Sequence, residues 1–205
     1  MDATSIAPTP PYKALIFDCD GTLADTLPVH FQTWSASLKA VGADISREWY
    51  YQHCATSAME MLQLLKDLFG YEFDSELVIA GRQKHYRTLI HMVKEIQAIA
   101  EIVRTHYGKV PMAVASGGER SVLKATLDSI KLRNFFDTVV SIDDVERGKP
   151  EPDIFLLASQ RLGVAPEDCI VYEDSDGGLE AARRAGMRSI DVRILWQAKT
   201  TEQGG

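Results

Sequence analysis

The pattern of apolar and polar residues changes character twice along this chain of 205 residues. A continuous apolar run at 14–17 is short and is soon followed by a glycine turn, which predicts a buried β-strand. From about residue 27 to about residue 94 the apolar residues recur at helical spacing, and no strand pattern interrupts them. After about residue 95 short apolar runs alternate with amphipathic segments, which predicts alternating strands and helices.

Three helices are predicted in the middle of the chain. The first ends at Gly42, because glycine is the residue that most often terminates a helix. The second opens with a capping-box pattern at 57–60 and ends at Gly70. Asp74 is placed to cap the third. These helices together predict an all-helical insertion.

The alternating second half is predicted to build a parallel sheet. The expected strands lie at 110–115, 138–141, 169–172 and 188–192, and the expected helices at 119–130, 152–162 and 179–185. Parallel strands are joined by helical crossovers that cover both faces, so the fold class is α/β, a doubly wound and Rossmann-like sheet. We assign 11–26 and 95–193 to the core, 27–94 to the helical insertion, and 1–10 and 194–205 to flexible tails.

Composition and charge restrict the possible partners. The formal net charge is −7 and lysine and arginine do not cluster, which argues against nucleic acid as a partner. No apolar run approaches the roughly 20 residues of a membrane span, and the first residues lack the pattern of a signal peptide. We therefore expect a cytoplasmic protein that binds no membrane. The expectation of a monomer or a weak dimer comes instead from the family resemblance given below.

Two carboxylates leave the first strand on the same side. Side chains alternate along a strand, so Asp18 and Asp20 face one way and Cys19 faces the other. Two like charges this close repel each other unless a cation or a reaction uses them. Cys19, facing away beside two charges that raise the pKa of a thiol, is expected to pack in the core rather than act as a nucleophile.

The other predicted strands also end in polar groups. These groups are Ser116-Gly117-Gly118, Glu173-Asp174-Ser175 and, in a loop, Gly148-Lys149-Pro150. Ligands of open parallel sheets bind at the carboxyl ends of the strands. We therefore expect these groups to meet the two aspartates in one reactive site.

The set of motifs resembles the four signature motifs of the haloacid dehalogenase-like hydrolases. The motifs are Asp18-x-Asp20-Gly21-Thr22, Ser116, Lys149 and Glu173-Asp174. The helical insertion is similar to the small cap that covers the site in one large branch of that superfamily. Segments 25–30 and 149–153 resemble the branch of β-phosphoglucomutases and small sugar phosphatases, and segment 104–118 resembles the fructose-1-phosphate phosphatases.

The resemblance implies a Mg²⁺-dependent phosphatase that acts on a small phosphorylated metabolite. Asp18 would attack phosphorus to give an aspartyl-phosphate, and Asp20 would serve as general acid and then as general base. Lys149 would neutralise Asp18 and one phosphoryl oxygen. The second aspartate favours phosphoryl transfer, because haloacid dehalogenases proper lack it and use no metal.

The resemblance also implies the ligands of the metal and of the phosphoryl group. Asp18, the main-chain carbonyl of Asp20 and Asp174 would bind Mg²⁺, with Glu173 in support, because Mg²⁺ prefers oxygen ligands. The phosphoryl oxygens would be held by Ser116 and by the backbone N–H groups of Gly117 and Gly118, which open a helix.

The leaving group must be recognised outside the core. His30 and Arg82 are the candidates for contact with a sugar, since both lie in the helical insertion. Two alternatives stay open. A β-phosphoglucomutase-type mutase is disfavoured because the loop at 55–59 has no arginine to hold a second phosphate. A binding or regulatory protein without turnover is disfavoured because every group that the chemistry needs is present.

Overall fold

The computed structural model describes residues 6–54 and 58–196, and its backbone divides into two compact units. Residues Thr26–Val93 form one of them, here called the helical unit. The chain on either side of it, up to Asp25 and from Lys94, forms the other, here called the core unit. The helical segment is thus an insertion in sequence between two parts of one core.

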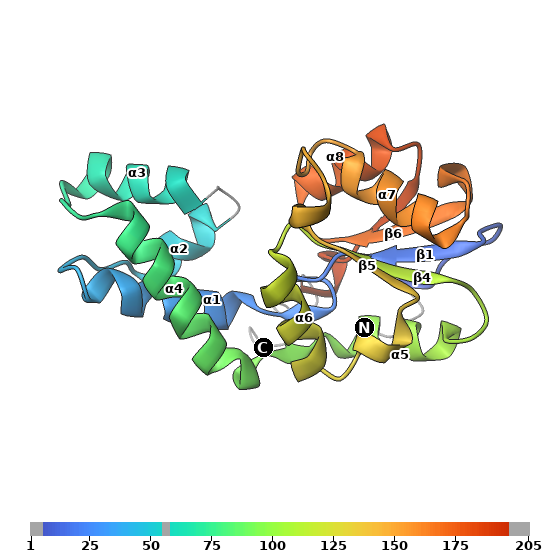
Figure 1. Ribbon diagram of the computed structural model, residues 1–205, viewed down its shortest axis with the longest axis horizontal. Coiled ribbons are helices and arrows are strands. Elements are labelled where there is room, and N and C mark those ends of the chain that lie inside the picture. Colours follow the sequence, from blue (N-terminus) through green and yellow to red (C-terminus); the bar gives the residue numbers. More distant parts are fainter. Residues whose placement is uncertain (1–5, 55–57, 197–205) are drawn as a thin grey trace, which may run out of the picture. The chain divides into compact units, whose positions relative to one another are not determined.

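Five parallel strands form the sheet of the core unit, in the order β5-β4-β1-β6-β7. They are β1 (Ala14–Phe17), β4 (Met112–Ala115), β5 (Thr138–Val140), β6 (Cys169–Glu173) and β7 (Arg188–Asp191). Helices α7 (Asp153–Leu162) and α8 (Asp176–Arg184) cover one face, and α5 (Gln97–His106) and α6 (Arg120–Ser129) cover the other (Figure 1). The prediction of a doubly wound α/β fold is confirmed.

Strand β1 is buried on both faces. Ala14 and Ile16 join one apolar cluster with Ile154 of α7, whereas the alternate residues leave toward the opposite face. There the ring of Phe17 stacks on Tyr172, with ring centroids 4.8 Å apart. Since β1 lies between β4 and β6, where the direction of winding changes, its carboxyl end is the position where sheets of this kind bind ligands.

Most predicted elements of the core unit lie close to the observed ones. The two differences concern helices α8 and α5. Helix α8 begins at Asp176 rather than at 179, because the Ser175 side chain accepts the N–H of Gly178 at 3.0 Å and so caps it. The two glycines at 177–178 have low helix propensity, so the sequence predicted only the part of this helix that follows them. Helix α5 was not predicted at all, although its apolar residues Ile99, Ile102 and Val103 are buried.

The described residues of the helical unit form helices and turns. They are α1 (Leu27–Lys39), α2 (Arg47–His53), α3 (Ala58–Phe69), α4 (Ser75–Leu89) and the short 3₁₀ turn η2 (Ile90–Met92). Asp74 caps α4 as predicted, accepting the N–H of Glu76 at 2.9 Å. Ser57 of the predicted capping box lies outside the described residues. In the parts of the chain that the structure describes, no helix is long and apolar enough to cross a membrane.

The two places where the chain passes between the units lie next to each other in the core unit. Strands β2 (Ala24–Asp25) and β3 (Lys94–Glu95) pair antiparallel, and the N–H of Ile96 donates to the carbonyl of Leu23 at 2.9 Å. The Arg104 guanidinium binds both carboxylate oxygens of Glu95, at 2.6 and 3.1 Å. Neither strand was predicted, because two residues are too few to show an alternating pattern.

Residues 6–10, which belong to the segment 1–10 that we expect to be a flexible tail, make contacts with the sheet. Ile6 is 1% exposed, and its carbonyl accepts a hydrogen bond from the buried Tyr172 hydroxyl at 2.9 Å. Arg188 donates to the carbonyls of Thr9 and Pro11. A buried tyrosine hydroxyl needs a partner, and this polar, proline-rich segment supplies it.

Candidate active site

The turn after β1 brings Asp18 and Asp20 to the end of the sheet. The carbonyl of Cys19 accepts the N–H groups of Leu23 and Ala24 at 3.0 and 2.9 Å, which folds the chain back on itself. Gly21 adopts φ +82° in this turn, and a Cβ there would lie 2.1 Å from Asp174 Oδ2. Only glycine therefore allows the turn and the close approach of the second acidic segment at the same point.

Cys19, between the two aspartates, points into the core. Its side chain is fully buried, and burial first, then the charge of Asp20, raises the pKa of its thiol. The prediction that Cys19 packs in the core is confirmed.

Lys149 joins two of the carboxylates. Its ammonium donates to Asp18 Oδ1 at 2.6 Å and to Glu173 Oε2 at 2.6 Å, and all three side chains are nearly buried. Burial alone would lower the pKa of Lys149, but attraction to the two carboxylates outweighs it and raises that pKa. Lys149 is therefore a fixed positive charge beside Asp18.

Three carboxylates crowd around this one ammonium. One oxygen each of Asp18, Glu173 and Asp174 can be chosen so that all lie within 4.8 Å of one another. Burial, followed by the charge of Glu173, raises the pKa of Asp18 well above its usual range and that of Asp174 to about 7. Negative charge at this depth exceeds what Lys149 can balance, and an all-oxygen set of this kind suits Mg²⁺.

Glu173 is held more firmly than the other two carboxylates. Its Oε1 accepts the N–H of Asp174, the N–H of Ser175 and the Ser175 hydroxyl, at 3.1, 3.0 and 2.8 Å. A Cβ at Gly178 would lie 2.0 Å from the Glu173 carboxyl carbon, so α8 approaches it closely. With Oε2 bonded to Lys149, Glu173 orients both Lys149 and the acidic turn in addition to any contact with a metal.

Ser116 ends β4 on the other side of β1. Its side chain is buried, and its Oγ accepts the N–H of Gly118 at 3.0 Å. The Gly118 N–H, which we expect to bind a phosphoryl oxygen, thus contacts the serine hydroxyl in this structure. At Gly117 a Cβ would meet nothing within 4 Å, so the space on that side of its Cα is open.

Asp20 lies near this serine turn. A Cβ built at Gly118 would lie 3.3 Å from Ser116 Oγ and 3.6 Å from Asp20 Oδ2. The structure therefore brings residues at or just after the ends of β1, β4 and β6 together with one lysine from the loop before α7: Asp18, Asp20, Ser116, Glu173, Asp174 and Lys149. Thr22 joins them, because its hydroxyl donates to Asp174 Oδ1 at 3.3 Å. Thr22 belongs to the first motif, but its position there did not predict this contact.

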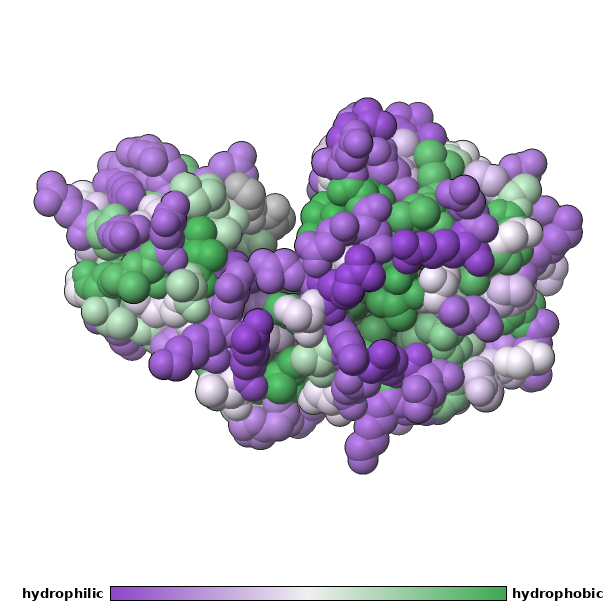
Figure 2. Space-filling model, viewed as in Figure 1, coloured by the Kyte–Doolittle hydropathy of each residue, from purple (hydrophilic) through white to green (hydrophobic). Residues whose placement is uncertain are grey.

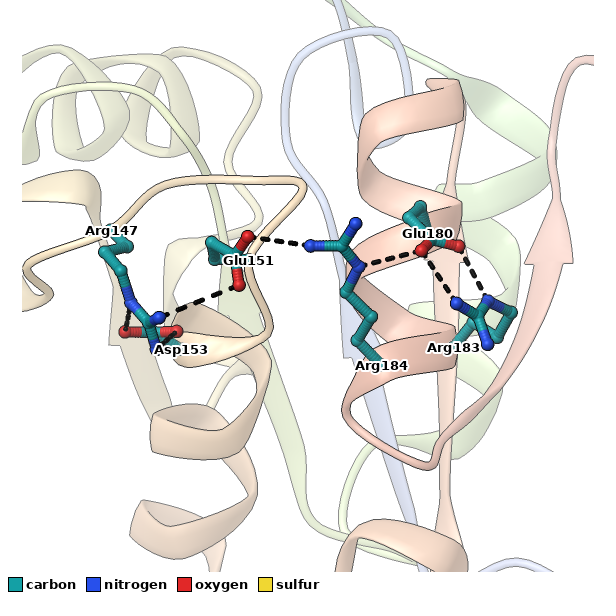
Figure 3. Close-up of polar contacts among 6 residues, drawn as sticks. All are labelled: Arg147, Glu151, Asp153, Glu180, Arg183 and Arg184. Carbon is teal, nitrogen blue, oxygen red and sulfur yellow. Dashed lines mark hydrogen bonds and ion pairs between the residues drawn. The ribbon is translucent and has the colours of Figure 1, made fainter.

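Ion pairs connect the loop that carries Lys149 to the start of α7 and to α8 (Figure 3). Arg147 and Asp153 lie on either side of Lys149 in the sequence, and Arg147 binds both carboxylate oxygens of Asp153, at 3.0 and 2.9 Å. Glu151 pairs with Arg184 of α8 at 2.7 Å, and Arg184 also binds Glu180. The two segments that supply Lys149 and Glu173 are thus joined at a second point, although exposed ion pairs of this kind contribute little to stability.

His30 and Arg82 lie in the helical unit, on α1 and α4. The His30 ring stacks on Tyr86 with centroids 4.7 Å apart, and the Arg82 guanidinium carbon lies 4.9 Å from the centre of the Trp34 ring. Trp34 and Tyr86 are buried, as expected for residues of this unit's own core. Both candidate residues are thus held against aromatic rings of the facing helix.

Comparison with known proteins identifies the family. Residues 15–192 match the family described as haloacid dehalogenase-like hydrolase. The chain is 36% identical over 184 residues to fructose-1-phosphate phosphatase YqaB of Escherichia coli strain K12, which covers 90% of this chain and 98% of that protein. It is 26% identical over 191 residues to β-phosphoglucomutase of Bacillus subtilis strain 168, covering 88% and 83%.

A similar fold is also found among solved structures. The crystal structure of CbbY from Rhodobacter sphaeroides in complex with phosphate superposes with a TM-score of 0.76, at 26% identity, covering 88% of this chain and 86% of that one. The resemblance read from the four motifs is confirmed by the family match and by these relatives. This chain belongs to the haloacid dehalogenase-like hydrolases.

Proposed function

We propose that the protein is a Mg²⁺-dependent phosphatase that hydrolyses a small sugar phosphate through an aspartyl-phosphate on Asp18. The observation that supports this most directly is the buried contact of Lys149 with Asp18 beside the acidic cluster, at the carboxyl end of β1. A nucleophilic carboxylate needs positive charge around it before it can meet a phosphate anion, and this site is built to collect that charge.

Asp18, Glu173 and Asp174 would hold the cation, together with the main-chain carbonyl of Asp20. Bound Mg²⁺ would supply the positive charge that allows a phosphate monoester to approach a carboxylate. Burial makes it costly for these carboxylates to be charged without a cation, and in the metal-free protein it raises the pKa values of Asp18 and Asp174.

The residues of the chain then divide the reaction between them. The Asp18 carboxylate attacks phosphorus while Lys149 stabilises the charge on a phosphoryl oxygen. The Ser116 hydroxyl and the Gly117 N–H donate to the remaining oxygens. Asp20 protonates the departing sugar oxygen and afterwards accepts a proton from the water that hydrolyses the aspartyl-phosphate.

The substrate class rests on the relatives and on the helical unit. The E. coli relative is named for fructose 1-phosphate, and we propose a substrate of that kind, a sugar with a primary phosphate. His30 and Arg82 would recognise its hydroxyl groups, as donors already fixed in place by Tyr86 and Trp34. A mutase reaction is the second candidate, because a β-phosphoglucomutase is among the relatives.

Phosphate release from a panel of sugar monophosphates tests the proposal. The wild-type protein with Mg²⁺ is expected to release phosphate from fructose 1-phosphate or a close analogue, and EDTA is expected to abolish the release until Mg²⁺ is restored. Full activity in EDTA would contradict the metal role. Interconversion of glucose 1-phosphate and glucose 6-phosphate, dependent on a bisphosphate, would favour the mutase instead.

The affinity for Mg²⁺ is expected to rise with pH. In the metal-free protein burial and the charge of Glu173 raise the pKa of Asp174 to about 7, so below that pH a proton occupies an oxygen that the metal needs. Affinity should therefore increase between about pH 6 and pH 8, with release of a proton on binding. Calorimetric titration with Mg²⁺ in buffers of different ionisation enthalpy measures both quantities.

The Thr22→Val variant is the matched control for that prediction. The Thr22 hydroxyl donates to Asp174 and lowers its pKa, so its removal should move the rise in affinity to higher pH. An affinity for Mg²⁺ that stays constant across this pH range in both proteins would show that Asp174 does not bind the metal as a carboxylate.

A further inference from the structure

The turn that follows β5 lies against the serine turn at the end of β4. Strands β4 and β5 pair in parallel up to Ala115 and Val140, and the contacts continue past both strand ends. The N–H of Ser116 donates to the carbonyl of Val140 at 3.0 Å, and the N–H of Ile142 donates to the carbonyl of Gly118 at 3.3 Å. The backbone of the serine turn is thus fixed on one side by the segment that later carries Lys149.

Asp143 extends this contact to the start of α6. Its Oδ2 accepts the N–H of Arg120, the first residue of the helix, at 2.9 Å. The residue in the N-cap position, Glu119, makes no capping hydrogen bond through its side chain. The first turn of a helix leaves N–H groups without partners inside the helix, and a carboxylate there is favoured by the helix dipole. A residue 23 positions away therefore caps the helix that the serine turn opens.

Asp144 anchors the same turn. Its side chain is 5% exposed, and Oδ1 accepts from Arg120 at 3.0 Å and from Arg161 of α7 at 2.6 Å. Its Oδ2 accepts the N–H and the hydroxyl of Ser141, each at 2.9 Å. Burial alone would raise the pKa of Asp144, but these hydrogen bonds hold it well below its usual range. The guanidinium of Arg120, two residues beyond the serine turn, is thereby bound to Asp144.

We infer that Asp143 is a positioning residue for phosphate binding, which fixes the Ser116–Gly118 turn through the start of α6 while Asp144 anchors the turn from which Asp143 projects. The inference rests on the proposed function, since it assumes that the Ser116 hydroxyl and the Gly117 N–H bind the phosphoryl group. Both groups bind in the ground state as well as in the transition state, so their misplacement acts mainly on affinity.

The test compares Asp143→Ala, Asp143→Asn and a control, Asp128→Ala, in the full chain with Mg²⁺. Asp128 lies near the far end of α6 and pairs with Arg133 at 3.3 Å, so its removal breaks an ion pair without touching the first turn. Loss of a cap weakens a helix start by about 1 kcal/mol, which corresponds to about 5-fold in affinity. We expect Asp143→Ala to raise KM and the inhibition constant of inorganic phosphate about 5-fold, with kcat changed less than about 2-fold.

Two further readouts separate positioning from general destabilisation. Asp143→Asn keeps an acceptor oxygen and is expected to restore most of the phosphate affinity. The amide hydrogen of Arg120 should exchange faster in Asp143→Ala than in the wild type, whereas Asp128→Ala should change neither that exchange nor the inhibition constant. Asp143 is exposed, so all three variants are expected to fold.

The outcomes distinguish the inference from the function on which it rests. An active wild type whose inhibition constant for phosphate is unchanged by Asp143→Ala overturns the inference alone. An equal rise in Asp128→Ala also overturns it, because a loosened helix would then be sufficient. A wild type that hydrolyses no phosphate ester and binds no inorganic phosphate overturns the proposed function, and this inference with it.

Discussion

The Asp18→Asn variant is expected to lose hydrolysis of sugar phosphates by about 10⁴-fold or more in kcat, with its fold intact. The amide oxygen does not attack phosphorus, so no aspartyl-phosphate forms at this position. Steady-state assays of released phosphate measure the loss. Since Lys149 still has Glu173 as a partner, the variant keeps the second buried ion pair of the site.

The same variant should be at least as stable as the wild type when metal is absent. Burial and the charge of Glu173 raise the pKa of Asp18, which means that its ionised form is held at a cost in free energy. An amide of the same shape removes one of the crowded charges. Thermal melting in EDTA measures this, and a Tm far below that of the wild type would contradict the crowding described above.

The Asp20→Asn variant is the mechanistic counterpart. With p-nitrophenyl phosphate, whose leaving group needs no proton, this variant should release about one equivalent of nitrophenolate rapidly and then turn over slowly. Asp18→Asn should show no such burst. A burst in Asp18→Asn, or its absence in both variants, would contradict the assignment of nucleophile and general acid and base.

The central site could be predicted because few physical rules were needed. Parallel strands place their carboxyl ends at one edge, so Asp18, Ser116 and Asp174 had to meet once their strands were recognised. Asp20 and Lys149 came from the motifs, and the structure brings both into the same region. The alternation of side chains along β1 was also enough to place Cys19 in the core.

Contacts that depend on distant segments were not predictable. The cap that Asp143 provides for α6 joins two different loops, and no local pattern signals it. The packing of Ile6 under Tyr172 is of the same kind, because a polar segment becomes ordered by one buried partner.

The Lys149→Met variant is expected to lose both activity and stability. Removal of the Lys149 ammonium leaves Asp18, Glu173 and Asp174 buried without this cationic partner. Breaking a buried ion pair in this way costs about 3–5 kcal/mol. Activity should fall by at least about 10²-fold, because a charge beside the phosphoryl group is lost. Urea denaturation in EDTA measures the free energy of unfolding.

The loss of stability should depend on pH in a direction that can be derived. Without Lys149, whose charge lowers both, the pKa values of Asp18 and Asp174 rise further in the folded state, whereas in the unfolded chain they stay near about 4. The folded variant then binds more protons than the unfolded one, so its stability falls as the pH rises above about 4. The difference from the wild type should therefore be small near that pH and large at neutral pH.

Added Mg²⁺ and a control substitution at an exposed lysine complete the test. Added Mg²⁺ should restore much of the stability of Lys149→Met, because a cation bound by these carboxylates offsets the same excess of negative charge. Lys13→Met, which removes an exposed lysine paired with Asp168 at 2.7 Å, should leave the free energy of unfolding nearly unchanged. If Lys149→Met is as stable as Lys13→Met at neutral pH in EDTA, the three carboxylates are not ionised together, and the electrostatic reason for a metal at this site fails.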